Sequence, residues 1–293
     1  MGRPFKLMMA RRTAEAFLRK EGITTLPVDP LAIAESRDIL VQPKLDAEPG
    51  VSGMLLRHGN SFGILYATHI QSLGFQRFSV SHELGHYFLE GHIDQVLRDG
   101  VHASHAGFVT ADPYELEADH FAAGLLMPET PFRAVMNDLE HGLNAIEALA
   151  DQCITSRTAT AIRYAELTRK AAAVIVSTGD TIDYCFMSDA MKTLPKLAWL
   201  RKGTKLPAGT ATADLASRPS DVRAGARVSD EIDVRDWLGG TTGGSISEES
   251  IGLGSYGKVL TVLSSGRIGR EEDDCDEEDD DEALIESWKP RFR

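Results

Sequence analysis

The sequence predicts an α+β fold with two domains. The first, over residues 1–170, is expected to be mainly helical with a small antiparallel sheet, and the second, over residues 171–269, to be a smaller α/β unit. A length of 293 residues suits two domains, and a hydrophobic content of 42% is typical of a soluble globular chain. Helical and strand-like patterns fill the first part, whereas strand-like runs and polar, Gly- and Pro-containing segments follow Lys170. The domain boundary is therefore predicted near residue 170.

Residues 270–293 are predicted to form an acidic, disordered tail. Eleven of the twelve residues from 271 to 282 are Asp or Glu, so most of the net charge of −13 belongs to this segment. A run of like charges stays solvated because it has too little apolar surface to bury. The rest of the chain is nearly neutral, and the overall acidity says little about its ligands.

The cysteines and the hydropathy indicate a cytoplasmic protein without a membrane partner. Cys153, Cys185 and Cys275 are odd in number and form no C-x-x-C pair, as expected in a reducing compartment. The apolar stretch 7–10 is too short for a secretion signal and is followed at once by Arg11. No run of about 18 apolar residues is present to span a membrane.

The first elements are two helices and a sheet. Residues 8–21 carry apolar positions at helical spacing, and a short helix is predicted from Pro30 to Ser36 with Asp29 as its N-cap. Three strand-like runs then predict the small antiparallel sheet: residues 39–41, 52–56 and 62–66.

The helix predicted over residues 75–90 carries the strongest chemical signal. It contains His82-Glu83-Leu84-Gly85-His86, an H-E-x-x-H motif. Residues four apart lie on one face of a helix, so His82 and His86 can direct two imidazoles at one metal ion. Glu83 then lies where a carboxylate can accept a proton from a metal-bound water. Gly85 is unfavourable inside a helix, which indicates close packing against another element.

A third ligand is needed, and His92 and Glu115 compete for the role. Residues 91–112 are expected to be a loop, and His92 would face away from His86 on a continuing helix. Glu115 opens a second helix that begins after Asp112 and runs to about residue 127, with Asp119 four residues on along the same face. Because a Glu can bind metal while such an Asp orients a ligand histidine, Glu115 is preferred and His92 is expected to be a bystander.

The remaining chain is predicted to hold further helices and then strands. A short helix begins near residue 130, and two helical patterns within residues 144–168 have the dimensions of a helix-turn-helix. Because this segment carries few cations, it is interpreted as a packing hairpin, and direct DNA binding is not expected. Strand-like runs follow at residues 173–176, 182–186 and 258–263.

One glycine motif resembles a dinucleotide-binding sequence but is interpreted as a turn. Residues 252–257 match G-x-G-x-x-G, but a strand-like run follows the motif and no strand is predicted before it. A dinucleotide site needs a strand before the glycines and a helix after them. The segment is therefore predicted to be a glycine-rich turn.

Two segments together resemble the ImmA/IrrE metallopeptidases. These are residues 77–86, which contain the H-E-x-x-H, and residues 115–128, ELEADHFAAGLLMP, and the resemblance extends over roughly residues 10–170. One departure is Asp119, where that family commonly has Asn. The resemblance implies a gluzincin-like, zincin-type metallopeptidase domain in which His82, His86 and Glu115 bind zinc or manganese, Glu83 is the general base and Asp119 supports a ligand from the second shell.

The same resemblance implies a regulatory protease. Members of that family typically cleave a helix-turn-helix repressor, often encoded beside them, and so relieve repression of stress or mobile-element genes. The alternative is a non-proteolytic DNA- or repressor-binding regulator whose metal site is structural or vestigial. The residues do not choose an oxyanion donor among Tyr87, Tyr114 and His120. The second domain is expected to be a sensor or a substrate-docking module.

Overall fold

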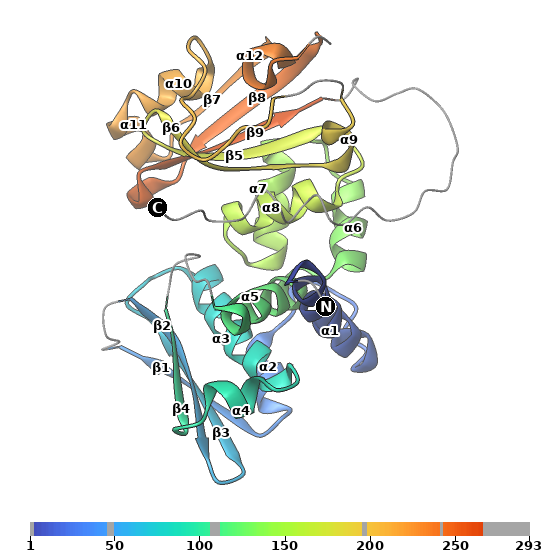
Figure 1. Ribbon diagram of the computed structural model, residues 1–293, viewed down its shortest axis with the longest axis vertical. Coiled ribbons are helices and arrows are strands. Elements are labelled where there is room, and N and C mark those ends of the chain that lie inside the picture. The colour runs from blue at the N-terminus through green and yellow to red at the C-terminus, as the bar shows by residue number, and fades with distance from the viewer. Residues whose placement is uncertain (1–2, 46–49, 106–111, 195–197, 241–242, 266–293) are drawn as a thin grey trace. The chain divides into compact units, whose positions relative to one another are not determined.

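The computed structural model describes residues 3–45, 50–105, 112–194, 198–240 and 243–265 (Figure 1). The predicted acidic tail, residues 270–293, lies outside the described residues. Within them the fold is mixed α and β, as predicted from the sequence.

The chain divides into two compact units. The N-terminal unit comprises Met1–Val135 and Leu149–Ala159, and the C-terminal unit comprises Met136–Ala148 and Thr160–Arg293. The chain changes unit within three helices, which are α6 (Glu129–Asn137), α7 (Leu143–Cys153) and α8 (Arg157–Leu167). The single boundary predicted near residue 170 thus differs from this division, in which the helical hairpin is shared.

The N-terminal unit contains a four-stranded sheet in the order β1-β3-β2-β4. Its strands are β1 (Ile39–Lys44), β2 (Val51–His58), β3 (Ser61–Ala67) and β4 (Val101–His105). The sheet is mixed, because β1 runs parallel to β3 while β2 is antiparallel to both β3 and β4. The prediction of a purely antiparallel sheet was wrong, since the β2–β3 hairpin leaves the outer edge of β3 open for a parallel partner.

The segment predicted as a loop, residues 91–112, also holds regular structure. It contains α4 (His92–Val96) and the edge strand β4. The sequence of β4, Val-His-Ala-Ser-His, alternates apolar and polar residues over only four positions, and its extended conformation is stabilised by pairing with β2. Such a strand is formed by a partner distant in sequence, and local periodicity does not reveal it.

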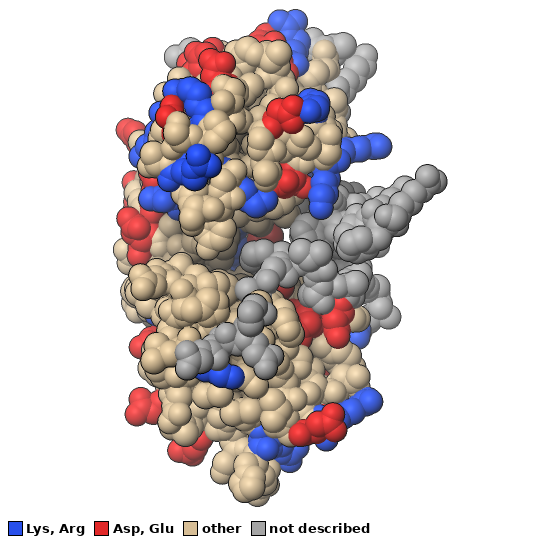
Figure 2. All heavy atoms as spheres, turned by 90° about the vertical axis from the view of Figure 1, so that its left-hand side faces the viewer, with Lys and Arg blue, Asp and Glu red and all other residues tan. Residues whose placement is uncertain are grey.

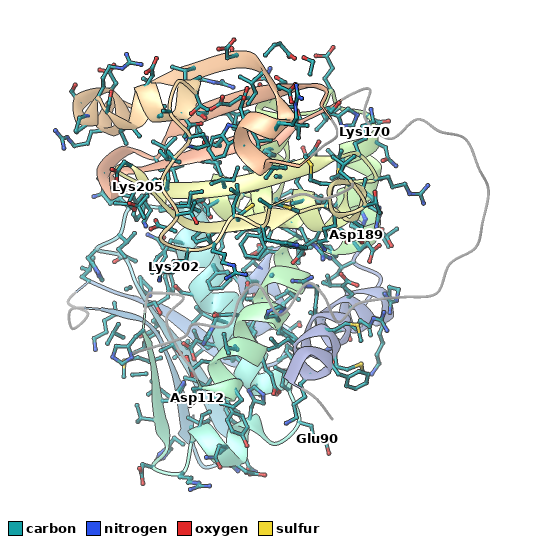
Figure 3. All side chains as sticks on the ribbon, turned by 45° about the horizontal axis from the view of Figure 1, so that its top comes forward. Glu90, Asp112, Lys170, Asp189, Lys202 and Lys205 are labelled. Atoms are coloured by element: carbon teal, nitrogen blue, oxygen red, sulfur yellow. The ribbon has the colours of Figure 1, made fainter. Side chains whose placement is uncertain are left out.

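Helices pack on this sheet in layers (Figure 1). The long helix α3 (Leu73–Phe88) contacts β2 and β3, α5 (Pro113–Leu126) contacts α3, and α1 (Arg3–Lys20) contacts α5. Two further helices are α2 (Pro30–Glu35) and α6 (Glu129–Asn137). The predicted N-caps of α2 and α5 are present: Asp29 accepts from the amide of Leu31, and Asp112 (Figure 3) from that of Tyr114, both at 2.9 Å.

The packing of α3 on α5 depends on Gly85. A Cβ atom at this position would lie 3.0 Å from Cα of Ala118 on α5. The expectation that Gly85 allows the close approach of another element is confirmed. This close approach brings the middle of α3 against the first half of α5.

The C-terminal unit contains a five-stranded antiparallel sheet in the order β6-β5-β9-β8-β7. The three predicted strands are β5 (Ala172–Thr178), β6 (Thr181–Met187) and β9 (Lys258–Ser264), whereas β7 (Arg227–Asp233) and β8 (Ser245–Gly252) were missed. Both missed strands are rich in polar residues. The short helices are α9 (Asp189–Lys192), α10 (Ala211–Ala216), α11 (Pro219–Ala224) and α12 (Val234–Leu238), of which α10 contacts β7, β8 and β9.

The glycine motif at residues 252–257 joins two antiparallel strands. The expectation that no strand precedes it was wrong, because β8 ends at Gly252, but its interpretation as a turn is confirmed. A short 3-10 helix (Gly254–Tyr256) lies inside the turn, and Gly257 has a φ of 63°. Without a following α-helix the segment does not have the geometry of a dinucleotide site.

The charged side chains of the C-terminal unit and the polar side chains of α8 differ in their exposure. Figure 2 shows basic and acidic side chains interspersed on the visible face of the C-terminal unit. On α8, Thr160 and Arg163 are buried rather than presented to a groove. None of the described helices combines the length and the apolar composition that crossing a membrane requires.

Candidate metal centre

Helix α3 brings the two motif histidines together. His82 and His86 lie one turn apart, and their Nε2 atoms are 3.1 Å from each other. Both rings are buried, at 6% and 0% exposure. The spacing predicted from the H-E-x-x-H motif is therefore present in the structure.

Helix α5 places Glu115 opposite these histidines. Its Oε2 is 3.3 Å from Nε2 of His82, and its Oε1 is 3.3 Å from Nε2 of His86. Among the described residues, His82, His86 and Glu115 form a group whose ligand atoms all lie within 4.8 Å of one another. Two imidazole nitrogens and one carboxylate are a donor set that suits zinc and leaves a further coordination position open.

Asp119 lies behind His82. Its Oδ1 is 2.8 Å from Nδ1 of His82, on the ring edge that faces away from Glu115. A hydrogen donated from Nδ1 to this carboxylate leaves the Nε2 lone pair directed at the other candidate ligands. From this position Asp119 can orient the ring of His82, which is the role expected for it from the sequence.

Glu83 is completely buried, and among the described residues neither carboxylate oxygen has a partner in good hydrogen-bond geometry. The hydroxyl of Ser104 on β4 lies close enough to stabilise the carboxylate in part, but not in the geometry of a hydrogen bond. It extends toward β2, where a Cβ atom added at Gly53 would lie 2.5 Å from its Oε1. Gly53 therefore provides the space that the carboxylate occupies. Burial raises the pKa of Glu83 to about 7, which is the range in which a carboxylate acts as a general base near neutral pH.

The expectation that His92 faces away from His86 was wrong. Helix α3 ends at Phe88, and the chain then turns through Gly91, which has a φ of 77°. His92 is 1% exposed, and its Nδ1 lies 3.1 Å from Nδ1 of His86. Its Nε2 lies 3.2 Å from Glu117 rather than near Glu115. His92 is thus outside the candidate ligand group but in contact with one member of it.

His102 is a site residue that the sequence did not indicate. It projects from β4, and its Nε2 lies 2.8 Å from Oε1 of Glu115. Its ring centroid is 4.7 Å from that of His86. The pairing of His102 with Leu55 of β2 brings it to the site, and no local motif encodes that pairing.

The three side chains considered as oxyanion donors are oriented differently. Tyr87 packs against Phe62, with ring centroids 5.1 Å apart, and belongs to the apolar core around α3. His120 has its Nδ1 3.4 Å from Arg11 of α1. Tyr114 lies edge-on to His92 at 5.0 Å. None of these contacts directs a donor at the group formed by His82, His86 and Glu115.

The two motif histidines have different charge states in the metal-free protein. Burial lowers the pKa of His86 to about 3, so this ring is neutral with a free lone pair. Burial also acts to lower the pKa of His82, but its bonds to Asp119 and Glu115 outweigh burial and raise it to about 10. Burial disfavours the charged form of Glu115, but bonds from three histidines hold its pKa well below the ordinary value. In the metal-free protein His82 is therefore protonated and donates from Nε2 to Glu115, and a metal ion would take the place of that proton.

Helix α3 with its two histidines and buried acid, the glutamate of α5 and the mixed sheet beneath them define a zincin-like metallopeptidase domain. Residues 34–164 match the family model described as the IrrE N-terminal-like domain. This part of the chain belongs to the ImmA/IrrE family of metallopeptidases.

The two remaining comparisons concern the fold and curated relatives. A solved structure named "Mycobacterium tuberculosis transcriptional regulator" is similar to this chain with a TM-score of 0.57 and 16% sequence identity. The match covers 90% of this chain and 82% of that one, and at this identity it shows a shared fold. No curated protein matches the chain.

Proposed function

We propose that the protein is a zinc-dependent endopeptidase whose active site is the group formed by His82, His86 and Glu115. The observation that carries this proposal is Glu83, a completely buried carboxylate one residue from a candidate ligand, with no hydrogen bond of good geometry to any described residue and only the hydroxyl of Ser104 nearby. A buried unpaired carboxylate is costly, and a metal site that served structure alone would not need it. Manganese is an alternative to zinc in the same donor set.

In the proposed mechanism, Glu83 transfers one proton in two successive steps. A bound zinc ion would acidify a water molecule and polarise the carbonyl group of the scissile peptide. Glu83 takes a proton from the attacking water as its oxygen bonds to the carbonyl carbon. Glu83 then passes that proton to the amine nitrogen as the carbon–nitrogen bond breaks. His102, held beside Glu115 at 2.8 Å, is proposed as the donor that stabilises the negative oxygen.

The substrate is proposed to be an extended segment of a protein. Strand β4 carries His102 and is at the edge of the described sheet, with β2 as its neighbour. An edge strand offers backbone donors and acceptors with which an extended peptide can pair. A peptide bound in this way would run beside the metal ligands.

We propose a helix-turn-helix repressor, encoded nearby, as the natural substrate, with derepression of stress or mobile-element genes as the outcome. The family assignment and the similar structure named as a transcriptional regulator support a role in transcriptional control. The protein would act in the cytoplasm, and the C-terminal unit would serve as a sensor or as a docking module for the substrate.

The test compares zinc-loaded wild type with Glu83→Gln on the neighbouring repressor. Wild type is expected to cut the repressor, whereas Glu83→Gln should bind zinc equally well and lose at least about 10²-fold in cleavage rate. Glu90→Gln, an exposed glutamate on the same stretch (Figure 3), is the matched control and should cleave like wild type. If wild type binds zinc and the repressor but does not cut it, the protein is a non-proteolytic regulator.

A further inference from the structure

The two candidate histidine ligands are supported in different ways. His82 contacts the carboxylate of Asp119 directly through its Nδ1. The Nδ1 of His86 instead faces Nδ1 of His92 at 3.1 Å, and Nε2 of His92 lies 3.2 Å from Oε2 of Glu117. His86 is thus connected to a carboxylate through a second imidazole.

The hydrogen positions along this connection follow from one condition. If Nε2 of His86 offers its lone pair to a metal, then Nδ1 of His86 must carry the hydrogen. That hydrogen can be accepted only if Nδ1 of His92 is unprotonated. The hydrogen of a neutral His92 is then on Nε2, where Glu117 accepts it. Each donor has an acceptor, and the direction of every hydrogen bond is determined.

We propose that His92 and Glu117 are positioning residues that hold His86 in its metal-binding tautomer. This inference rests on the proposed function, because it assumes that His86 binds a metal through Nε2. The connection is fixed at both ends by the fold: Gly91 turns the chain at a φ of 77° so that His92 returns to His86, and Glu117 comes from α5 two residues after Glu115. The ring of Tyr114 also contacts that of His92 edge-on, with centroids 5.0 Å apart.

The alternative is that His92 only fills space in the core. A core-filling ring would be replaced equally well by an apolar ring of similar size. His92, however, is 1% exposed with both nitrogens within hydrogen-bond distance of a partner. Partners of this kind typically change metal affinity by about 10- to 100-fold when they are removed.

The test measures the zinc dissociation constant of the full chain by competition with a chromogenic chelator, without substrate. His92→Phe keeps the ring but removes the acceptor, and it should weaken zinc binding by about 10- to 100-fold. His92→Asn, whose Oδ1 can take the place of Nδ1, should recover most of that loss. Glu117→Gln should weaken binding by a smaller factor, and His58→Phe, an exposed histidine on β2, should leave it unchanged.

A second readout is independent of affinity. The 15N chemical shifts of the zinc-loaded protein should show hydrogen on Nδ1 of His86 and on Nε2 of His92. Equal zinc affinity of wild type and His92→Phe, or hydrogen on Nδ1 of His92, would overturn the proposal. If circular dichroism of the metal-free protein shows that His92→Phe does not fold, Glu117→Gln provides the test. A zinc affinity of Glu117→Gln equal to that of wild type would then overturn the proposal. A wild type that binds zinc but cleaves nothing would contradict the proposed function and leave this inference standing.

Discussion

Glu83 in the N-terminal unit and Glu248 in the C-terminal unit are both completely buried, but their carboxylates have different surroundings. Oε1 of Glu248 accepts hydrogen bonds from the amide and the hydroxyl of Thr212, near the start of α10, while its Oε2 has no partner among the described residues. Among the described residues, Glu83 has no partner in good hydrogen-bond geometry on either oxygen and lies near His82, His102 and the hydroxyl of Ser104. Burial alone therefore does not indicate function. A buried carboxylate that caps a helix serves the fold, whereas one kept without partners beside metal-ligand candidates fits a chemical role.

The largest predicted effect is the loss of cleavage rate in Gly53→Ala. The new Cβ would lie 2.5 Å from Oε1 of Glu83 and would displace the proposed base. Because misplacement of a catalytic group by about 1 Å costs on the order of 10²-fold, cleavage should fall by about 10²- to 10³-fold. The zinc dissociation constant should stay within a few-fold of wild type. Steady-state cleavage of the repressor, with zinc content measured in parallel, checks both.

Gly63→Ala is the matched control for that variant. Gly63 is also a strand glycine of this sheet, but a Cβ there would meet its nearest neighbour, the carbonyl oxygen of Leu40, at 3.5 Å. Its cleavage rate should stay near that of wild type. Equal losses in both variants would mean that Gly53 matters for the sheet and not for the position of Glu83.

A second effect is expected in the stability of the C-terminal unit. Glu248→Ala removes the acceptor of two buried donors of Thr212 and leaves a cavity, which should cost about 3 to 4 kcal/mol in the free energy of unfolding. Urea unfolding measures this loss, and Glu231→Ala on the exposed strand β7 should change it by less than about 0.5 kcal/mol. If the stability of Glu248→Ala equals that of wild type, Glu248 does not stabilise the fold, and the contrast with Glu83 does not hold.

The smallest effect is a pH dependence of the metal-free protein. Burial raises the pKa of Glu83 from 4.5 to about 7, so the unfolded chain releases this proton at lower pH than the folded chain does. The raised pKa therefore lowers the stability of wild type as pH rises from 4.5 to 7, by about 2 to 3 kcal/mol. Glu83→Gln lacks this titration, so its stability relative to wild type should increase over the same interval. Urea unfolding at pH 5 and pH 8 measures the difference in free energy of unfolding between Glu83→Gln and wild type. An equal difference at the two pH values would contradict the prediction.

The parts of the site that share a helix could be predicted from the sequence. His82, Glu83 and His86 follow from the helical repeat alone, and so does the placement of Asp119 one turn after Glu115. The approach of the two helices was indicated by Gly85, whose cost inside a helix needed a packing reason. These inferences hold because hydrogen bonds between residues four apart determine which side chains share a face.

What only the tertiary structure determined is the part of the site that joins separate elements. His102 reaches Glu115 because β4 pairs with β2, and residues 101–105 alone do not specify a strand. His92 reaches His86 because the chain turns at Gly91 after α3 has ended, whereas a continuing helix would have turned it away. Contacts of this kind depend on long-range pairing and on the exact end of a helix. The helical repeat determines the spacing of the candidate ligands along each helix. Only the packing of the fold determines which further side chains surround them.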